Sequence, residues 1–343
     1  MRVMITGGTG FIGAHTVSAV LDAGYEPTLL VRNPERVRRN VGALGVDTEA
    51  LRLVVGDMAD ADAVATAVAD AEAVIHAAAM VAPLNRSHAQ QTIETNVNGT
   101  RTVVEAALAA GCDPVVHVSS VAAVFDPREP LIHADLPPVT SADSPYTRSK
   151  ALAEQLVRGH QAAGEPVTIV YPGGVMGPPA GDAVGEVAEG FVSMLKSGFV
   201  ALSDGGVGIV DVRDVARALA ATLTPGAGPR RFMAGGDLVS LRDIGAILRR
   251  LTGRRMPVLP TPGVVFRGLG QAMDGVRRLV PFDTVFTKEA MEILTLARPT
   301  DDSAVHDVLG VDYRSPDETV EATLRGLYAM GLLSARQAGA LAR

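Results

Sequence analysis

The chain has 343 residues, of which 47% are hydrophobic and 20% charged, and this length fits two domains or one large α/β unit. Its formal net charge of −7 argues against a general nucleic-acid-binding surface. The single cysteine, Cys112, excludes a disulfide framework and a cysteine-based metal site, and it fits a reducing compartment.

Targeting signals are the next feature to consider. The sequence has no apolar run of about 18 residues, so we expect no transmembrane helix. The first predicted strand begins at Arg2, which leaves no room for a signal peptide. We therefore expect a cytoplasmic protein, and the scattered histidines predict no metal site.

Apolar strands alternate with helical stretches through the first half of the chain. The predicted strands cover residues 2–5, 27–31, 53–55, 73–76, 114–118 and 167–171. Helices are predicted from residue 11 and over 60–71, 92–110 and 144–163. This alternation is typical of an α/β fold with a Rossmann-like, doubly wound parallel sheet. The carboxyl ends of the strands then share one edge, where ligands bind.

The pattern loosens after about residue 177. We predict a helix over 186–197, a return to the sheet and another helix over 207–223, and a strand over 231–234. Ser240 and the capping box that begins at Ser315 predict two further helices. The predicted NADP-binding Rossmann domain is 1–176, with a return at 207–235. A smaller, mostly helical substrate-binding lobe is predicted for 177–206 and 236–343.

A glycine-rich turn follows the first strand. Gly7 and Gly10 stand between that strand and the next predicted helix, and Gly13 lies in the first turn of this helix. Glycines let a backbone approach a pyrophosphate closely, and the N–H groups of a helix N-terminus favour an anion. Because the turn has this strand–helix context, we interpret it as a dinucleotide site rather than a structural turn.

The residue after the second strand indicates which dinucleotide binds. An acidic residue there binds the ribose 2′-OH of NAD, whereas an arginine accommodates the 2′-phosphate of NADP. This position is Arg32, and neither Val31 nor Asn33 is acidic. The sequence therefore favours NADP over NAD.

Tyr146 and Lys150 are four residues apart on a predicted helix, so they share one face. Two charges about 4 Å apart at an effective dielectric of about 20 interact by roughly 4 kcal/mol, enough to lower a tyrosine pKa by about three units at most. The pair can thus exchange protons near neutral pH. A serine at the end of the fifth strand, Ser119 or Ser120, can hydrogen-bond a substrate oxygen.

These motifs, taken together, resemble the extended short-chain dehydrogenase/reductases of the NAD-dependent epimerase/dehydratase superfamily. They are TGGTGFIG at 6–13, GDMAD at 56–60, HAAA at 76–79, NVNGT at 96–100, HVSSVAAV at 117–124, YTRSK at 146–150, YPGGVMGP at 171–178 and VDVRDVARA at 210–218. The chain is most similar to the branch of dihydroflavonol-4-reductase-like and 3β-hydroxysteroid-dehydrogenase-like proteins, to which LVRNPER at 30–36 also points.

The resemblance implies a role for individual residues. The pyrophosphate would be held by Gly7, Thr9, Gly10, Phe11 and Ile12, and the 2′-phosphate by Arg32 and Arg39. Asp57 and Met58 would flank the adenine, and Ala77 and Ala78 the path to the nicotinamide. Val118, Pro172 and Val175 would complete the cofactor site. Tyr146 would donate or accept the proton, Lys150 would lower its pKa and hold the ribose, and Ser120, rather than Ser119, would contact the substrate oxygen.

Two departures narrow the reaction. Sugar epimerases of this family carry V-Y-G where this chain has Val124-Phe125-Asp126. Dehydratases carry an acidic pair where Val121 and Ala122 stand, so elimination would lack its carboxylates. We expect an oxidoreductase that interconverts a carbonyl and an alcohol on a small hydrophobic substrate. The alternatives are a sugar-nucleotide epimerase with tightly bound NAD and a non-catalytic nucleotide sensor.

Interactions with other molecules are the last expectation. Family resemblance implies a homodimer through the helices 92–110 and 144–163. Residues 264–282 alternate apolar residues with arginines, and we interpret them as a flap over an apolar substrate in preference to a peripheral membrane contact. Asp211 and Asp214 are predicted to act structurally between the two parts of the chain.

Overall fold

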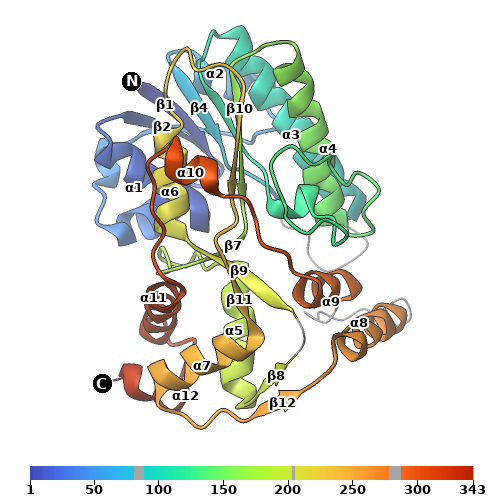
Figure 1. Ribbon diagram of the computed structural model, residues 1–343. Helices are drawn as coiled ribbons and strands as arrows, with labels where there is room; N and C mark the ends of the chain where they lie inside the picture. The colour runs from blue at the N-terminus through green and yellow to red at the C-terminus, as the bar shows by residue number, and fades with distance from the viewer. Residues whose placement is uncertain (81–88, 203–204, 278–286, 343) are drawn as a thin grey trace.

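A seven-stranded parallel sheet forms the upper part of the molecule (Figure 1). The structure is a computed structural model and describes residues 1–80, 89–202, 205–277 and 287–342. The strand order is β10-β6-β5-β4-β1-β2-β3. The strands are β1 (Arg2–Thr6), β2 (Glu26–Val31), β3 (Arg52–Val55), β4 (Ala73–His76), β5 (Val115–Val118), β6 (Val167–Pro172) and β10 (Arg230–Ala234). The predicted doubly wound fold is confirmed.

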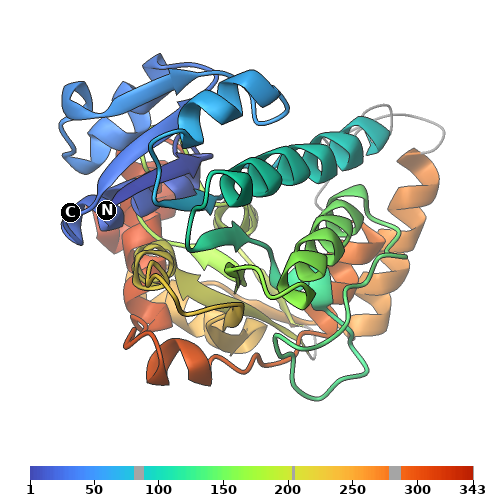
Figure 2. The ribbon, with the colours of Figure 1, turned by 90° about the horizontal axis from the view of Figure 1, so that it is seen from above.

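Helices cover both faces of this sheet, as the view from above shows (Figure 2). One face carries α1 (Phe11–Asp22) and α6 (Val212–Ala221); the other carries α2 (Ala61–Val68), α3 (Ala89–Ala109) and α4 (Pro145–Ala162). Each face of the sheet has its own hydrophobic core. In β1, Val3 and Ile5 point into the first core, beneath α1 and α6, and Met4 points into the second core on the opposite face. Because both faces are buried there, the central strands β1, β4, β5 and β6 are largely apolar instead of alternating.

Capping residues begin several helices at the predicted places. The Ser144 side chain accepts a hydrogen bond from the Thr147 backbone N–H, and Pro145 occupies the first turn of α4. Ser315 and Glu318 form the predicted capping box of α11 (Pro316–Ala329). Ser240 caps α7 (Leu241–Thr252), which ends at Gly253 with a φ of 67°. These caps satisfy backbone groups that the helix itself leaves unpaired.

A smaller lobe lies below the sheet (Figure 1). The third hydrophobic core of the protein lies in this lobe. It contains Phe191 and Leu195 of α5 (Glu186–Ser197), Ile244 of α7 and Leu324 of α11. The remaining elements of the lobe are β7 (Gly174–Met176), β8 (Val200–Leu202), β9 (Gly206–Asp211), β11 (Asp237–Ser240), β12 (Val258–Pro260) and α12 (Ala335–Ala338). The lobe is therefore mostly helical, with two small sheets, β11-β9-β7 and β12-β8.

The predicted return of residue 207 to the main sheet is wrong for the strand itself. β9 pairs in parallel with β7 and antiparallel with β11, apart from the seven-stranded sheet. A Cβ at Gly173 would meet the Gly235 carbonyl oxygen, so the segments after β6 and β10 run against each other as both leave the sheet. By contrast, α6 does pack on α1, and β10 joins the edge of the sheet.

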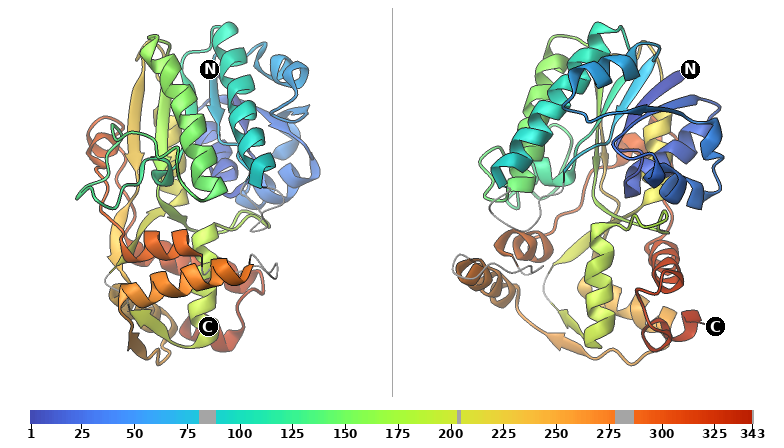
Figure 3. Two further views of the ribbon diagram at one scale, coloured as in Figure 1. Left: turned by 90° about the vertical axis from the view of Figure 1, so that its right-hand side faces the viewer. Right: turned by 180° about the vertical axis from the view of Figure 1, so that it is seen from behind.

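Helices α8 (Gly263–Arg277) and α9 (Lys288–Thr295) pack against each other beside the smaller lobe (Figure 3). The segment predicted as a flap, 264–282, is helical as far as 277, and residues 278–282 lie outside the described part of the chain. The short helix α10 (Ser303–Asp307) and turns over Val37–Val41, Gly42–Leu44, Thr48–Ala50, Val121–Val124 and Gly339–Ala342 complete the structure. No helix among the described residues is long and apolar enough to cross a membrane.

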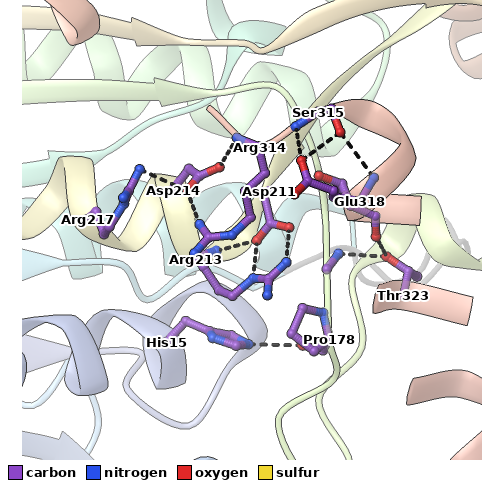
Figure 4. A network of polar contacts seen from close by, with 12 residues as sticks. His15, Pro178, Asp211, Arg213, Asp214, Arg217, Arg314, Ser315, Glu318 and Thr323 are labelled. Carbon is purple, nitrogen blue, oxygen red and sulfur yellow. Dashed lines mark hydrogen bonds and ion pairs between the residues drawn. The ribbon is translucent and has the colours of Figure 1, made fainter. Parts of the chain in front are cut away.

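A polar network joins the sheet to the C-terminal segment (Figure 4). Asp211 caps α6 and pairs with Arg213 at 2.6 Å. Asp214 accepts a hydrogen bond from the Arg314 backbone N–H at 2.7 Å and also pairs with the Arg314 and Arg217 side chains. Both carboxylates are fully buried. These contacts are consistent with the structural role expected for the two aspartates.

Candidate active site

The predicted cofactor residues converge on the carboxyl edge of the main sheet. Six strands contribute: Gly7 to Ile12 follow β1, Arg32 follows β2, Asp57 and Met58 follow β3, Ala77 and Ala78 follow β4, Val118 ends β5 and Pro172 ends β6. Tyr146 and Lys150 lie on α4, and Val175 lies on β7. A parallel, doubly wound sheet binds its ligands at this edge.

The glycine turn is shaped for close backbone approach. Gly7 has a φ of +74°, and a Cβ there would lie 2.6 Å from the Ala78 backbone nitrogen. The Gly10 N–H donates to the Gly7 carbonyl oxygen at 2.9 Å. Gly10 is the N-cap of α1 and has no side chain to occupy the helix N-terminus. The turn therefore fits the pyrophosphate of a dinucleotide.

Buried polar contacts hold the ends of β1 and β4 together. The Thr6 hydroxyl lies 2.7 Å from His76 Nδ1 and accepts a hydrogen bond from the Ala78 N–H at 3.2 Å. His76 Nε2 lies 3.1 Å from the Thr100 hydroxyl on α3. Burial, with a smaller effect of the Lys150 charge, lowers the pKa of His76 to about 3. The imidazole therefore stays neutral and acts structurally.

The basic cluster after β2 divides into two parts. Arg32 is largely exposed, and its Nη1 lies 3.7 Å from Asp57 Oδ2 after the neighbouring strand β3. Arg39 instead pairs with Asp182 at 2.9 Å, and Arg36 pairs with the same carboxylate at 3.8 Å. Their positive charges lower the pKa of Asp182, the Arg39 hydrogen bond being the largest cause. The structure thus brings the Arg32 guanidinium close to Asp57, which is predicted to flank the adenine. The Arg39 guanidinium pairs with Asp182 instead.

Asn40 and Asp182 were missed in the sequence. Buried Asn40 lies in the π-helical turn Val37–Val41, and its side-chain amide donates to the Thr9 carbonyl oxygen at 2.8 Å. Its Oδ1 accepts from the Asp182 N–H at 3.1 Å. Asn40 therefore fixes the glycine turn against the loop between β7 and α5. Nothing in the local sequence indicates contacts over such separations.

Ser119 and Ser120 differ in their surroundings at the end of β5. Ser120 is half-buried, and its hydroxyl oxygen accepts from the Ala122 N–H at 3.2 Å, capping the turn Val121–Val124. Ser119 is buried, and its Oγ has no hydrogen-bond partner among the residues that the structure describes. Since Ala122 takes only an oxygen lone pair, the Ser120 O–H is left to donate.

Lys150 lies on the buried side of α4, one turn after the half-buried Tyr146. Its Nζ donates to the Val118 carbonyl oxygen at 3.0 Å. Burial lowers the pKa of Lys150 to about 8, against the opposing effects of the Glu186 and Glu154 carboxylates. The ammonium is thus fixed at the end of β5, next to the serine pair, and remains protonated at neutral pH.

Asn96 is a further residue that positions Tyr146, and the spacing of Tyr146 and Lys150 does not predict it. Its side-chain amide donates to Ser149 Oγ at 2.9 Å, and Ser149 donates to the Tyr146 carbonyl oxygen at 2.7 Å. Asn96 also exchanges two hydrogen bonds with the Met80 backbone. It therefore joins the turn that carries Tyr146 to the segment after β4. Its place in the NVNGT motif was the available signal.

Contacts around α5 bring the smaller lobe to the sheet edge. A Cβ at Gly185 would lie 2.7 Å from both the Phe11 ring and the Val175 carbonyl oxygen. The next residue, Glu186, begins α5. Partial burial raises the pKa of its carboxyl group, and the Lys150 charge opposes this effect.

At the other end of the site, Met58 packs against Gly99 of α3. No group of metal-ligating side chains occurs among the described residues.

The chain belongs to the NAD-dependent epimerase/dehydratase family, whose model matches residues 3–235. Sterol demethylase protein B of Methylococcus capsulatus is 29% identical over 91% of this chain and 93% of its own length. A putative dihydroflavonol 4-reductase of Synechocystis is 31% identical over 75% of this chain and 74% of its own. The family predicted from the motifs is confirmed, and with it an NAD(P)-dependent enzyme.

The fold is shared with solved structures of low sequence identity. The UDP-glucose 4-epimerase of Stenotrophomonas maltophila, solved with bound NAD and formylated UDP-arabinopyranose, aligns with a TM-score of 0.77 and 19% identity. The alignment covers 97% of this chain and 100% of the epimerase. At this identity, the likeness concerns the fold alone.

Proposed function

We propose that the protein is an NADP-dependent reductase or dehydrogenase that interconverts a carbonyl and an alcohol on a small hydrophobic substrate. The observation that carries the proposal is the hydrogen bond from Lys150 Nζ to the Val118 carbonyl oxygen at 3.0 Å. It holds an ammonium group one helical turn from Tyr146, at the strand end that bears Ser120. Positive charge at this place stabilises a phenolate and makes proton transfer feasible near neutral pH.

The proposed roles follow from the donors available. In the direction of reduction, the bound nicotinamide supplies a hydride to the carbonyl carbon. Ser120 donates a hydrogen bond to the carbonyl oxygen, where negative charge develops. Tyr146 delivers a proton to that oxygen, and Lys150 stabilises the resulting phenolate. The negative charge of Glu186 raises the pKa of Lys150 and so helps to keep Lys150 protonated.

NADP is the cofactor that Arg32 supports. Its guanidinium stands after β2, is largely exposed, and reaches the space beside Asp57. A guanidinium binds a 2′-phosphate bidentately. Arg39 has a partner in Asp182, so its predicted contact with the phosphate requires that pair to separate. The remaining proposed cofactor residues are Gly7, Thr9, Gly10, Phe11, Ile12, Asp57, Met58, Ala77, Ala78, Val118, Pro172 and Val175.

The names of two relatives, sterol demethylase protein B and putative dihydroflavonol 4-reductase, support a hydrophobic substrate. The type of reaction has a separate support: the chain lacks the acidic pair of dehydratases and the V-Y-G of epimerases. We assign cofactor binding to 1–176 together with α6 and β10, and substrate binding to 177–206 and 236–343 together with β9, which lies in the smaller lobe.

A homodimer through α3 and α4 is proposed as the quaternary structure. These two helices border a surface hollow of about 720 Å³ that is lined by apolar and polar residues, a surface that a second copy of the chain could cover. Ile93 and Val97 come from α3, and Leu152 and Leu156 from α4. The cytoplasmic location stays a prediction.

The experiment is a screen of NADPH and NADH oxidation against ketones, aldehydes, steroids and flavonoids, with the bound nucleotide measured after purification. We expect protein free of tightly held NAD and turnover of an apolar carbonyl compound with NADPH. Co-purified NAD together with epimerisation of a nucleotide sugar would contradict the proposal in favour of the epimerase. NADPH binding without turnover of any compound would favour the nucleotide sensor.

A further inference from the structure

Helix α8 turns an apolar face toward solvent. Val264, Val265, Leu269 and Val276 are 65%, 53%, 44% and 47% exposed. Gly268, Ala272 and Gly275 are exposed between them. At 100° per residue these seven positions occupy one side of the helix, and we call this side the α8 face. None of the exposed side chains of α8 that the structure describes carries a charge.

The opposite side of α8 packs against the protein. Phe266 is 9% exposed, and a Cβ at Gly270 would lie 2.6 Å from the Thr287 carbonyl oxygen at the start of α9. Asp274, the acidic residue of α8, accepts a hydrogen bond from the Lys288 N–H at 3.0 Å. The Arg267 side chain donates to Thr295 Oγ1 at 3.0 Å. The orientation of α8 is therefore fixed by these contacts, with the apolar side chains outward.

This orientation argues against a flap whose apolar side chains line the substrate site. Figures 1 and 3 show α8 at the outer edge of the molecule, with α9 between it and the upper part. A covering flap would turn its large apolar residues inward, yet on α8 most of them are exposed. The inward side has Phe266, the half-buried Met273, two glycines and the polar anchors just described. The α8 face is thus left to an external partner.

We propose that the α8 face is a membrane-docking surface that rests on a lipid bilayer. A helix of 15 residues is about 22 Å long and about 10 Å wide, so its side offers about 200 Å². A specific protein–protein interface takes about 800 Å² per partner. A bilayer needs no matching shape, and it accepts a small apolar stripe along a helix lying in the interface.

The described charges of α8 do not oppose docking on a bilayer that contains anionic lipid. Arg267 offsets the charge of Asp274, and the Asp274 carboxylate points away from the α8 face toward the Lys288 N–H. Gly268 and Gly275 have open space where a Cβ would be, so packing does not require them. Exposed glycines weaken a helix in water by about 1 kcal/mol each, and burial of the face in a bilayer would offset that weakness.

The docking surface is connected to the proposed active site. Lys288 of α9 pairs with Asp143 at 3.2 Å, and Asp143 comes directly before Ser144, the N-cap of α4. The α8–α9 pair therefore contacts the end of the helix that carries Tyr146. A protein docked through α8 would hold this end of α4 near the bilayer, where apolar compounds are concentrated. The docking itself does not depend on the proposed hydride transfer.

The test is co-flotation of the full chain with vesicles of phosphatidylcholine and phosphatidylglycerol in equal amounts. We expect the wild type to float with the vesicles and the variant Val264→Ser/Leu269→Gln to partition about tenfold less, since each change removes apolar area from the contact. The matched control is Val308→Ser/Leu332→Gln, whose parent residues are 63% and 46% exposed elsewhere on the surface. The control should float like the wild type.

Three results would overturn the proposal. The wild type could stay wholly in solution, or the α8 variant could float as well as the wild type while both melt at the same temperature. A lower molar mass of the α8 variant in light scattering would assign the face to an interface between copies of the chain. Vesicle binding needs no turnover, so a negative result here leaves the proposed reductase activity untouched.

Discussion

Lys150 donates from its Nζ to the carbonyl oxygen of Val118 at 3.0 Å, joining the middle of α4 to the end of β5. The contact explains how a buried ammonium is retained: the carbonyl dipole satisfies one of its three N–H groups. It also sets where positive charge lies relative to the serines after β5 and to Tyr146 on the preceding turn. The proposed proton chemistry depends on this placement.

Replacement of Lys150 by methionine should change how stability depends on pH. Burial lowers the pKa of Lys150 from 10.5 to about 8 in the folded protein, so folding with a charged lysine carries a penalty that is fully present below pH 8. The penalty disappears as pH rises to the unfolded value. Relative to Lys150→Met, the wild type should gain up to about 3 kcal/mol of unfolding free energy between these values. Urea unfolding at pH 7.5 and 9.5 spans part of this interval and should show about 2 kcal/mol of the gain.

Lys288→Met is the control for that experiment. Lys288 is exposed, and its pKa is raised by the hydrogen bond to Asp143. Its removal should give no gain of wild-type stability over the same pH interval. A difference between wild type and Lys150→Met that does not change with pH would contradict the depressed pKa.

Arg32→Ala should impair the use of NADPH selectively. Loss of a charge-assisted contact with the 2′-phosphate is expected to raise the Michaelis constant for NADPH roughly tenfold to a hundredfold, with no change for NADH. Arg38→Ala is the matched control, since Arg38 belongs to the same basic cluster but binds Glu35 and Glu49. An equal effect of both variants would assign the preference to the field of the whole cluster.

Gly7→Ala should abolish cofactor binding. Gly7 and Gly24 have nearly equal φ angles, +74° and +78°, so a side chain strains both backbones. Only at Gly7 does a Cβ also collide with the chain, at Ala77 and Ala78, whereas the space around Gly24 is open within 4 Å. Fluorescence titration with NADPH should show binding lost in Gly7→Ala and retained in Gly24→Ala. Similar affinities of the two variants would place the cofactor away from this turn.

The central strands of the main sheet could be predicted because they are largely apolar on both sides. Helix caps such as Ser240 and Ser315 were readable because their partners lie within a few residues. The exit of β9 into a second sheet could not be foreseen, because it depends on pairing with β7 and β11, which are remote from β9 in sequence. The strands β7, β8 and β12 have three residues each, which is too short for a hydrophobic pattern to predict them.

The site shows the same division between local and distant contacts. The Tyr146–Lys150 pair follows from helical spacing, and Arg32 from its place after β2. The hydrogen-bond acceptor of Lys150 is the backbone carbonyl oxygen of Val118. Every residue has such a carbonyl, so the sequence does not indicate which one accepts. Asn40 reaches Thr9 across 31 positions and Arg39 reaches Asp182 across 143. The outward face of α8 is decided by its packing on α9, so its apolar pattern alone left two interpretations open.

Single-turnover NADPH oxidation by Tyr146→Phe tests the central claim most directly. The phenol oxygen is the proposed proton donor, and general acid catalysis contributes about 10²- to 10⁴-fold. With a carbonyl substrate from the screen, we expect the oxidation rate to fall by at least about 100-fold, while the dissociation constant for NADPH stays within about twofold of the wild type. An oxidation rate equal to that of the wild type would contradict the assignment of Tyr146 and, with it, the proposed reaction.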